Sequence, residues 1–376
     1  MSLCKSHLTK YLPSYYLFPH GAFQALWNVY GARDTHWKLT YERDYIKMND
    51  GGTLSIDWAY PSGEEMESQE VRKVVIIFPG LSGHSHKGYV KSLAKHLSQD
   101  CGYIVGVFHN RGVSQEFTSP VLPDICSSEE INTAIQHMVK KQKHENKRTY
   151  FSGIGMSMGA NLMMKIAGEQ GDNFALDAMV SLNNPFDIWL AINLMRGKPY
   201  EKFLAIELKN QLINKKKISK DEELVFKQMA QKFGIDFKAL SKISTWRDWD
   251  EQYTKKAYRN YPTLADYYFS ASSLPLISKV KRPTLVIHSK DDPIIPIECL
   301  PVNECLSNPH MIVGIVEKGG HVCYFQGVKG QKRWYPLVSG EFLDALIELR
   351  ERQRVEREEA EKQLMYSGFS TNSQSV

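Results

Sequence analysis

The chain has 376 residues, of which 42% are hydrophobic and 24% are charged, with 47 Lys and Arg against 42 Asp and Glu. This apolar fraction is large enough for a packed core, which excludes a globally disordered chain. The formal net charge of +5 is small for this length, and the basic stretches carry no interleaved aromatic side chains. We therefore expect no nucleic-acid partner.

The six cysteines include no C-x-x-C pair, which argues against a zinc site, and we interpret them as free thiols in a reducing compartment. The sequence contains no uninterrupted run of about 18 apolar residues, so we expect no membrane-spanning helix. The first residues lack the apolar segment and the cleavage site of a signal peptide. We expect an intracellular protein that is cytoplasmic or peripherally attached to a membrane.

After an N-terminal arm over residues 1–36, the chain alternates predicted strands and helices. Two segments of strand character flank Asn49-Asp50-Gly51-Gly52, where glycine supplies positive φ, and they predict a β-hairpin. Six short apolar runs are typical of strands buried on both faces of a parallel sheet. These runs are Val74–Phe78, Tyr103–Phe108, Tyr150–Ile154, Ala178–Leu182, Thr284–His288 and Ile312–Val316. With helical stretches such as Val90–Leu97 between them, they predict an α/β fold with a mostly parallel, doubly wound sheet.

One long interval and the C-terminus break this alternation. Residues 185–281 carry amphipathic helical patterns, among them Tyr200–Leu212 and Lys220–Phe233, and no buried strand. We therefore expect a helical lid inserted into a core made of residues 37–184 and 282–350. The lysines of Lys209–Lys220 suit contact with a membrane surface, although a solvated helix end is the more ordinary interpretation. Residues 351–376 predict a charged helix and then a disordered tail over Ser367–Val376. A protein partner on that helix is the alternative to exposure to solvent.

The strongest motif is Gly155-Met156-Ser157-Met158-Gly159. A predicted strand precedes it and a predicted helix follows it, which is the strand–turn–helix of a nucleophile elbow. Glycine on either side of Ser157 lets neighbouring backbone pass this tight turn without a Cβ clash. The pattern predicts that Ser157 is a nucleophile, and the alternative is a serine that only caps a helix.

A serine hydroxyl needs a base that a third group holds in place. The strand Thr284–His288 leads into Asp291 and Asp292, and either aspartate can be the orienting acid. The next strand is followed by Gly319-Gly320-His321, where the paired glycines allow a loop that lays His321 over the edge of the sheet. A nucleophile, an acid and a base therefore follow three separate predicted strands, in the order expected for this fold.

Two backbone N–H groups commonly meet the negative charge that develops on a substrate carbonyl oxygen during acyl transfer. One donor should be the N–H of Met158, which follows the nucleophile. The other should come from the loop after Val74–Phe78, and we assign it to Leu81.

Taken together, these residues resemble the AB hydrolase superfamily, and more narrowly the AB hydrolase 4 family of esterases and lipases. The matching segments are Leu12-Pro13 with Gly21, Phe78–Gly83 with Ser85-His86, Asn110-Arg111-Gly112, Gly155–Asn161, Thr245–Asp250, Asp266-Tyr267-Tyr268 with Ala271-Ser272, Asp291-Asp292-Pro293 and Gly319-Gly320-His321. The resemblance implies an α/β-hydrolase fold with a triad of Ser157, Asp292 and His321. It favours Asp292 over Asp291 because the family pattern places a proline four residues after the acid, as Pro296 does here.

The expected function is that of a serine esterase or lipase acting on lipid-like carboxylic esters through an acyl-enzyme, without cofactor or metal. His84 and His86 lack a carboxylate or cysteine partner at ligand spacing. One alternative is an acyltransferase that uses the same triad. Another is a non-catalytic member that binds lipid or serves as an assembly subunit, motivated by the charged C-terminal helix and by Pro79, where family members usually have histidine.

Overall fold

A computed structural model describes residues 10–14, 20–30, 38–62, 70–212, 218–327 and 332–370. One sheet of eight strands forms its centre, in the order β1-β2-β4-β3-β5-β6-β7-β8. The strands are β1 (Glu42–Lys47), β2 (Thr53–Ala59), β3 (Val71–Phe78), β4 (Ile104–His109), β5 (Arg148–Met156), β6 (Ala178–Leu182), β7 (Thr284–Ser289) and β8 (Met311–Val316). β2 pairs antiparallel with β1 and with β4, whereas the other pairs are parallel. This confirms the predicted hairpin and the mostly parallel sheet.

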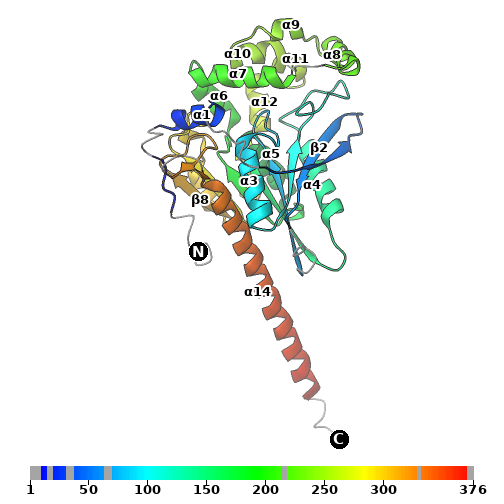
Figure 1. The fold of residues 1–376 in the computed structure, drawn as a ribbon, viewed down its shortest axis with the longest axis vertical. Helices are drawn as coiled ribbons and strands as arrows, with labels where there is room; N and C mark the ends of the chain where they lie inside the picture. The colour runs from blue at the N-terminus through cyan, green and yellow to red at the C-terminus, as the bar shows by residue number, and fades with distance from the viewer. Residues whose placement is uncertain are drawn as a thin grey trace.

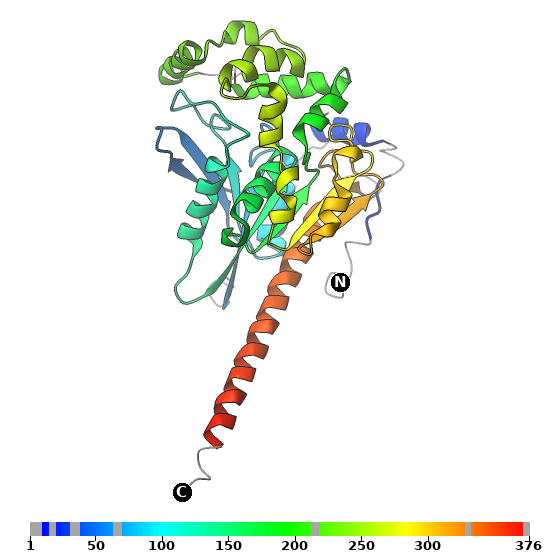
Figure 2. The ribbon, with the colours of Figure 1, turned by 180° about the vertical axis from the view of Figure 1, so that it is seen from behind.

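Helices cover both faces of the sheet (Figures 1 and 2). They are α3 (Gly88–Lys95), α4 (Glu129–Gln142), α5 (Met158–Gln170), α13 (Val302–Ser307) and α14 (Tyr335–Ser370), with the short turns η2 (His96–Asp100), η3 (Gly171–Asn173), η5 (Leu274–Lys279) and η6 (Ile297–Cys299). On β3, Val74 and Ile76 pack with side chains of α4 and α5, whereas Val75 and Ile77 pack with those of α3 and α14. Successive side chains of a strand point to opposite faces, so both layers are apolar and the sheet is doubly wound.

The last strand, β8, departs from the prediction. The run Ile312–Val316 was expected to be buried on both faces, but Ile312 and Ile315 are 42% and 39% exposed. β8 is the end strand of the sheet, and among the described residues no strand pairs with its outer edge. The prediction of burial is wrong here because hydropathy does not distinguish an edge strand from a central one.

The described part of the interval 185–281 contains helices and no strand. These elements are α6 (Ile188–Met195), α7 (Pro199–Leu212), α8 (Lys220–Phe233), α9 (Phe237–Leu240), α10 (Trp246–Trp249), η4 (Asp250–Thr254), α11 (Lys255–Ala257) and α12 (Leu264–Ala271). Most of them form a layer at the top of Figure 1, beyond the carboxyl ends of the parallel strands. Within the lysine-rich piece, residues 213–217 lie outside the described residues, and Lys209 Nζ donates to Ile243 O at 2.6 Å.

The N-terminal part of the chain packs beside the core, whereas the C-terminal end projects away from it. The N-terminal helix α1 (Gly21–Tyr30) and the ribbon of β9 (Phe325–Gln326) and β10 (Lys332–Arg333) lie beside the core. In contrast, the distal part of α14 leaves the body (Figures 1 and 2). α14 extends through residues 367–370, where the sequence predicts a disordered tail, and residues 371–376 lie outside the described part. In the described chain, no helix combines the length and apolar character needed to cross a bilayer.

Candidate active site

Ser157 lies at a strained turn between β5 and α5. Its φ is 53° and its ψ is −120°, a backbone conformation that costs a non-glycine residue about 1–3 kcal/mol. The neighbouring glycines allow the close approach: a Cβ on Gly155 would lie 2.4 Å from Ala160 Cα, and one on Gly159 would lie 2.1 Å from Phe78 O. The Ser157 N–H donates to Leu182 O at 2.8 Å, which fixes the turn to β6.

The side chains of the three predicted residues meet at the carboxyl ends of their strands. His321 Nε2 is 2.9 Å from Ser157 Oγ, and His321 Nδ1 is 2.8 Å from Asp292 Oδ2. A carboxylate at Nδ1 selects the tautomer that carries its proton there and leaves Nε2 free to accept the serine proton. The carboxylate of Asp292 is fully buried, whereas the His321 side chain is 14% exposed at its edge.

Two backbone N–H groups orient the acid from its other side. Asp292 Oδ1 accepts from Ile294 N at 2.8 Å and from Ile295 N at 2.9 Å. His288 is buried nearby, with its Nε2 3.0 Å from Ile295 O. Burial lowers the pKa of His288, so this ring is neutral near neutral pH and adds no competing cation beside the acid.

Asp291, the alternative acid, has other partners. Its Oδ1 accepts from Gly319 N at 2.8 Å and from Gly320 N at 2.9 Å. These bonds hold the glycine loop that leads into His321. The structure therefore brings Asp292 to the histidine and places Asp291 behind the loop.

The N-terminal helix packs against this loop from outside. A Cβ on Gly21 would lie 2.0 Å from Asp291 O and 2.9 Å from Gly320 Cα, so only glycine fits at this contact. Gln24 Oε1 accepts from Phe325 N at 3.1 Å, which ties α1 to the chain just after the loop. The sequence reasoning did not foresee this support, although Gly21 belongs to the N-terminal segment that matches the family.

The two predicted oxyanion donors line one pocket beside Ser157. Met158 begins α5, and Leu81 lies in the loop after β3. That loop approaches the nucleophile so closely that a Cβ on Gly80 would lie 3.2 Å from Ser157 Cβ. The assignment of Met158 and Leu81 as oxyanion donors stays a prediction. That prediction requires the loop of Leu81 to lie next to the serine, as it does here.

A buried polar cluster, missed by sequence reasoning, fixes the far end of this loop. Ser85 Oγ donates to Asp57 Oδ2 at 2.5 Å, and Ser85 N donates to His109 Nε2 at 3.1 Å. Arg43 donates to both carboxylate oxygens of Asp57, at 2.6 and 2.8 Å. Burial lowers the pKa of His109 to about 3, so its ring stays neutral and can accept. Alternation with Leu54, Ile56 and Trp58 predicts that Asp57 faces solvent, so the sequence carries no signal of this buried acid.

His84 and His86 flank this cluster, and the structure does not place them as metal ligands. Burial lowers the pKa of His84 to about 4. Among the described residues, no three His, Cys, Asp or Glu side chains are arranged to hold a metal ion. Arg111, in the Asn110-Arg111-Gly112 segment, is also structural: it pairs with Asp50 at 2.8 Å and with Glu130.

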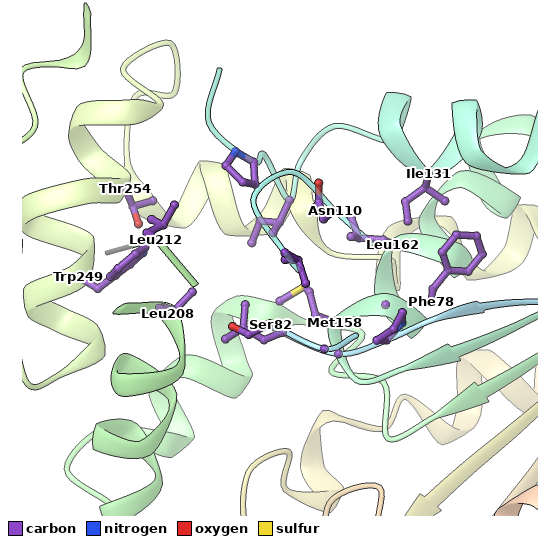
Figure 3. A pocket seen from close by; sticks show the side chains of 18 of the residues that line it. Phe78, Ser82, Asn110, Ile131, Met158, Leu162, Leu208, Leu212, Trp249 and Thr254 are labelled. Atoms are coloured by element: carbon purple, nitrogen blue, oxygen red, sulfur yellow. The ribbon is translucent and has the colours of Figure 1, made fainter. Parts of the chain in front are cut away.

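A mainly apolar pocket of about 950 Å³, including its open mouth, extends past the predicted oxyanion donors between core and lid (Figure 3). One end is formed by core side chains such as Phe78, Ile131 and Leu162, and the other by lid side chains such as Leu212 and Trp249. The remaining lid wall is mostly aromatic, with Leu208 and Thr254 beside Trp246, Tyr253, Tyr258, Tyr267 and Tyr268. Met158 lies between these two ends, and the lining does not include Ser157 or His321, so the pocket lies beside the nucleophile.

Comparison with known proteins places this geometry in context. A family model described as alpha/beta hydrolase fold matches residues 73–328. Monoacylglycerol lipase of Saccharomyces cerevisiae is 26% identical over 328 residues, which cover 85% of this chain and 70% of the yeast protein. Human phospholipase ABHD3 is 26% identical over 316 residues, covering 82% and 73% of the two chains.

A second yeast protein, medium-chain fatty acid ethyl ester synthase/esterase 2, is 28% identical over 396 residues, covering 89% of this chain and 85% of its own. Among solved structures, the Pyrococcus furiosus esterase Pf2001 superposes with a TM-score of 0.51 at 16% identity, covering 82% of this chain and 92% of the esterase. That likeness concerns the fold, and with the matched family model it confirms the predicted fold class.

Proposed function

The chain belongs to the alpha/beta hydrolase fold family, and we propose that it is a serine hydrolase that cleaves carboxylic esters of lipid-like substrates. The observation that carries the proposal is the series Ser157 Oγ, His321 and Asp292, joined at 2.9 and 2.8 Å. A nucleophile, a base and an orienting acid at these distances have the arrangement that acyl transfer requires.

The reaction begins when His321 Nε2 takes the proton of Ser157 Oγ as that oxygen attacks the ester carbonyl carbon. Asp292 stabilises the imidazolium that forms, and the N–H groups of Met158 and Leu81 receive the oxyanion. His321 then protonates the leaving alkoxide, and the alcohol departs from the acyl-enzyme. Water, deprotonated by His321, attacks the acyl carbon in the second half, which releases the carboxylic acid and restores the Ser157 hydroxyl.

The pocket supports a lipid-like substrate. The two predicted oxyanion donors, beside which the ester carbonyl must lie, line this pocket together with apolar and aromatic side chains. Each methylene of an acyl chain buried there contributes about 0.8 kcal/mol to binding. The names of two relatives, a monoacylglycerol lipase and a phospholipase, point to the same class of substrate.

Hydrolysis assays test the proposal. Wild type and Ser157→Ala are compared on p-nitrophenyl esters of increasing chain length, a monoacylglycerol and a phosphatidylcholine. We expect wild-type turnover that rises with chain length and falls at least about 10³-fold in Ser157→Ala. Ester turnover that survives the substitution, or a folded wild type inactive on every ester, would contradict it. The second outcome would favour a non-catalytic lipid-binding or assembly role.

Acyl transfer to an alcohol is the second candidate. It uses the same acyl-enzyme, with an alcohol in place of water in the second half, and one relative is named both a synthase and an esterase. Product analysis with and without added ethanol distinguishes the two: a transferase forms the ethyl ester in preference to the free acid.

A further inference from the structure

Asn183 is buried beside the predicted triad, and the function described so far does not use it. It follows β6 directly, has no exposed surface, and adopts a φ of 46° that is rare for a side-chain-bearing residue. Its backbone N–H donates to Ile287 O at 2.9 Å, which fixes it between the ends of β6 and β7. Strained, fully buried polar residues occur where the surrounding structure holds them firmly.

The Asn183 amide bonds to the acid and to both chain neighbours of His321. Its Nδ2 donates to Asp292 Oδ2 at 2.7 Å and to Gly320 O at 3.3 Å. Its Oδ1 accepts from Val322 N at 3.2 Å. Asp292 Oδ2 is the same oxygen that meets His321 Nδ1, so the amide bridges the acid and the loop that carries the base.

Tyr324 completes the set. Its hydroxyl donates to Asn183 Oδ1 at 2.7 Å, and burial raises its pKa well above the ordinary value, so it remains a donor. With this bond the orientation of the amide is determined: Oδ1 faces two donors, and Nδ2 faces the carboxylate and a carbonyl. The opposite orientation would face donor to donor and carbonyl to carboxylate.

We propose that Asn183 is a positioning residue of the triad, which holds the Asp292 carboxylate and the His321 loop in register through one amide. The inference rests on the proposed function. Asp292 accepts four bonds in this arrangement, from Asn183, His321, Ile294 and Ile295, so its carboxylate can neither rotate nor move away from the imidazole. In the described chain the Asn183 side chain bonds to Asp292 and to the loop of His321 and does not line the pocket, so it acts through those two residues.

Two substitutions of Asn183 distinguish a positioning role from the mere filling of space. Asn183→Asp keeps the shape of the side chain and the acceptor for Val322 and Tyr324, but it places a carboxylate oxygen against Asp292 Oδ2. Asn183→Ala removes all four bonds and the volume. If Asn183 only fills space, Asn183→Ala loses stability but keeps its kcat. If it positions the triad, kcat falls in both variants, because Asn183→Ala releases the Asp292 carboxylate and Asn183→Asp repels it from the histidine.

Asn308 provides a matched control. It is 5% exposed, and its Nδ2 donates to Ile277 O at 2.7 Å and Val280 O at 3.0 Å, while its Oδ1 accepts from His310 N at 2.9 Å. It precedes β8 and lies at the opposite ends of the parallel strands from the triad. Asn308→Asp therefore perturbs a buried amide of the same kind without contact to the site.

The test measures kcat, KM and thermal unfolding for wild type, Asn183→Asp, Asn183→Ala, Tyr324→Phe and Asn308→Asp on one p-nitrophenyl ester. We expect kcat to fall about 10- to 100-fold in both Asn183 variants, with KM changed less than about threefold. Tyr324→Phe, which removes one bond and little volume, should lose a few-fold. Asn308→Asp should be destabilised but keep its kcat. An Asn183→Asp enzyme with near-wild-type kcat would overturn the proposal, as would a loss matched by Asn308→Asp.

A spectroscopic readout keeps this test independent of turnover. The proton between His321 Nδ1 and Asp292 should give a far-downfield proton NMR signal in the wild type, which Ser157→Ala retains. We expect the Asn183 variants to lose or shift this signal and Asn308→Asp to keep it. An unchanged signal in Asn183→Ala would refute the positioning role. If the folded wild type shows the signal but cleaves no ester, the proposed function fails while the role of Asn183 is still decided.

Discussion

At the scale of single residues, two adjacent aspartates after β7 make different contacts. Asp292 meets His321 Nδ1, and Asp291 accepts from Gly319 and Gly320. Only the resemblance to the family, through Pro296, favoured Asp292. The place of the two aspartates after the strand could not separate them, because the tertiary position of the histidine loop decides which one reaches the ring. The same reason explains why Asn183 was not foreseen, since its partners lie more than 100 residues further along the chain.

These contacts predict unequal effects of two isosteric substitutions. Asp292→Asn removes the charge that orients His321 and should lower kcat by about 10⁴-fold. Asp291→Asn keeps the oxygen that the glycine N–H groups need and should retain kcat within about tenfold. Steady-state kinetics on one ester measures both, and equal losses would contradict the assignment of Asp292.

Gly159 gives a steric prediction at the same scale. A Cβ there would lie 2.1 Å from Phe78 O and 2.4 Å from Pro79 O, so alanine must push the loop of Leu81 away from the serine. We expect Gly159→Ala to lose at least about 100-fold in kcat/KM and to unfold at a lower temperature. Gly314→Ala, whose new Cβ would lie 3.7 Å from its nearest neighbour, is the control. Equal kinetics for the two variants would count against the close approach.

At the scale of elements, the lid carries a buried acid. Asp250 begins η4, is 1% exposed, and accepts from the Tyr268 hydroxyl, which in turn accepts from Trp246 Nε1 at 3.0 Å. Its Oδ2 has no hydrogen-bond partner in the described chain. Burial raises the pKa of Asp250 from 3.8 to about 6, against smaller lowering effects of its interactions with Tyr268 and Thr254 and of the charge of Arg196. Two segments that match the family, Thr245–Asp250 and Asp266-Tyr267-Tyr268, therefore meet in one lid contact.

This acid makes stability depend on pH. Between about pH 4 and 6 the folded chain holds a proton that the unfolded chain has lost, so the free energy of unfolding should fall by up to about 3 kcal/mol over that range and stay lower above it. Asp250→Asn keeps the acceptor for Tyr268 without the charge. We expect it to be more stable than wild type at about pH 7 and equal to it near pH 4, by urea denaturation. A variant less stable than wild type at the higher pH would contradict this.

Periodicity predicted most elements well. Ala178–Leu182 and Lys220–Phe233 match β6 and α8 residue for residue, because burial on both faces and an amphipathic stripe are local properties. The predicted helix Val90–Leu97 instead ends at Lys95 and continues as the π-helical turn η2. That change, like the exposure of β8, depends on neighbours that a single sequence window does not contain.

At the scale of the whole molecule, α14 joins the core for only part of its length. Phe342 and Leu343 are buried in the core, and near the middle Arg350 pairs with Asp177 while Glu351 accepts from Tyr150 at 2.6 Å. The distal part leaves the body (Figures 1 and 2). The protein partner predicted for this helix stays a prediction.

Truncation of the chain tests whether the distal part of α14 contributes to the stability of the fold. Deleting residues 356–376 should change the free energy of unfolding by less than about 0.5 kcal/mol and leave ester turnover unchanged, because the contacts of Arg350 and Glu351 remain. Phe342→Ala, by comparison, opens the core and should cost about 3–5 kcal/mol. Denaturant unfolding measures the stability of both variants, and gel filtration measures the size of their assemblies. Lost stability together with a smaller assembly on truncation would show that the distal helix packs against another chain.

Active-site labelling tests the central claim most directly. A fluorophosphonate phosphonylates a serine only when a base activates it, so it reports the nucleophile without knowledge of the substrate. We predict that wild type is labelled on the peptide that contains Ser157, identified by mass spectrometry, and that folded Ser157→Ala takes up no label. A folded wild type that resists the probe, or a Ser157→Ala protein labelled to the same extent, would contradict a catalytic Ser157.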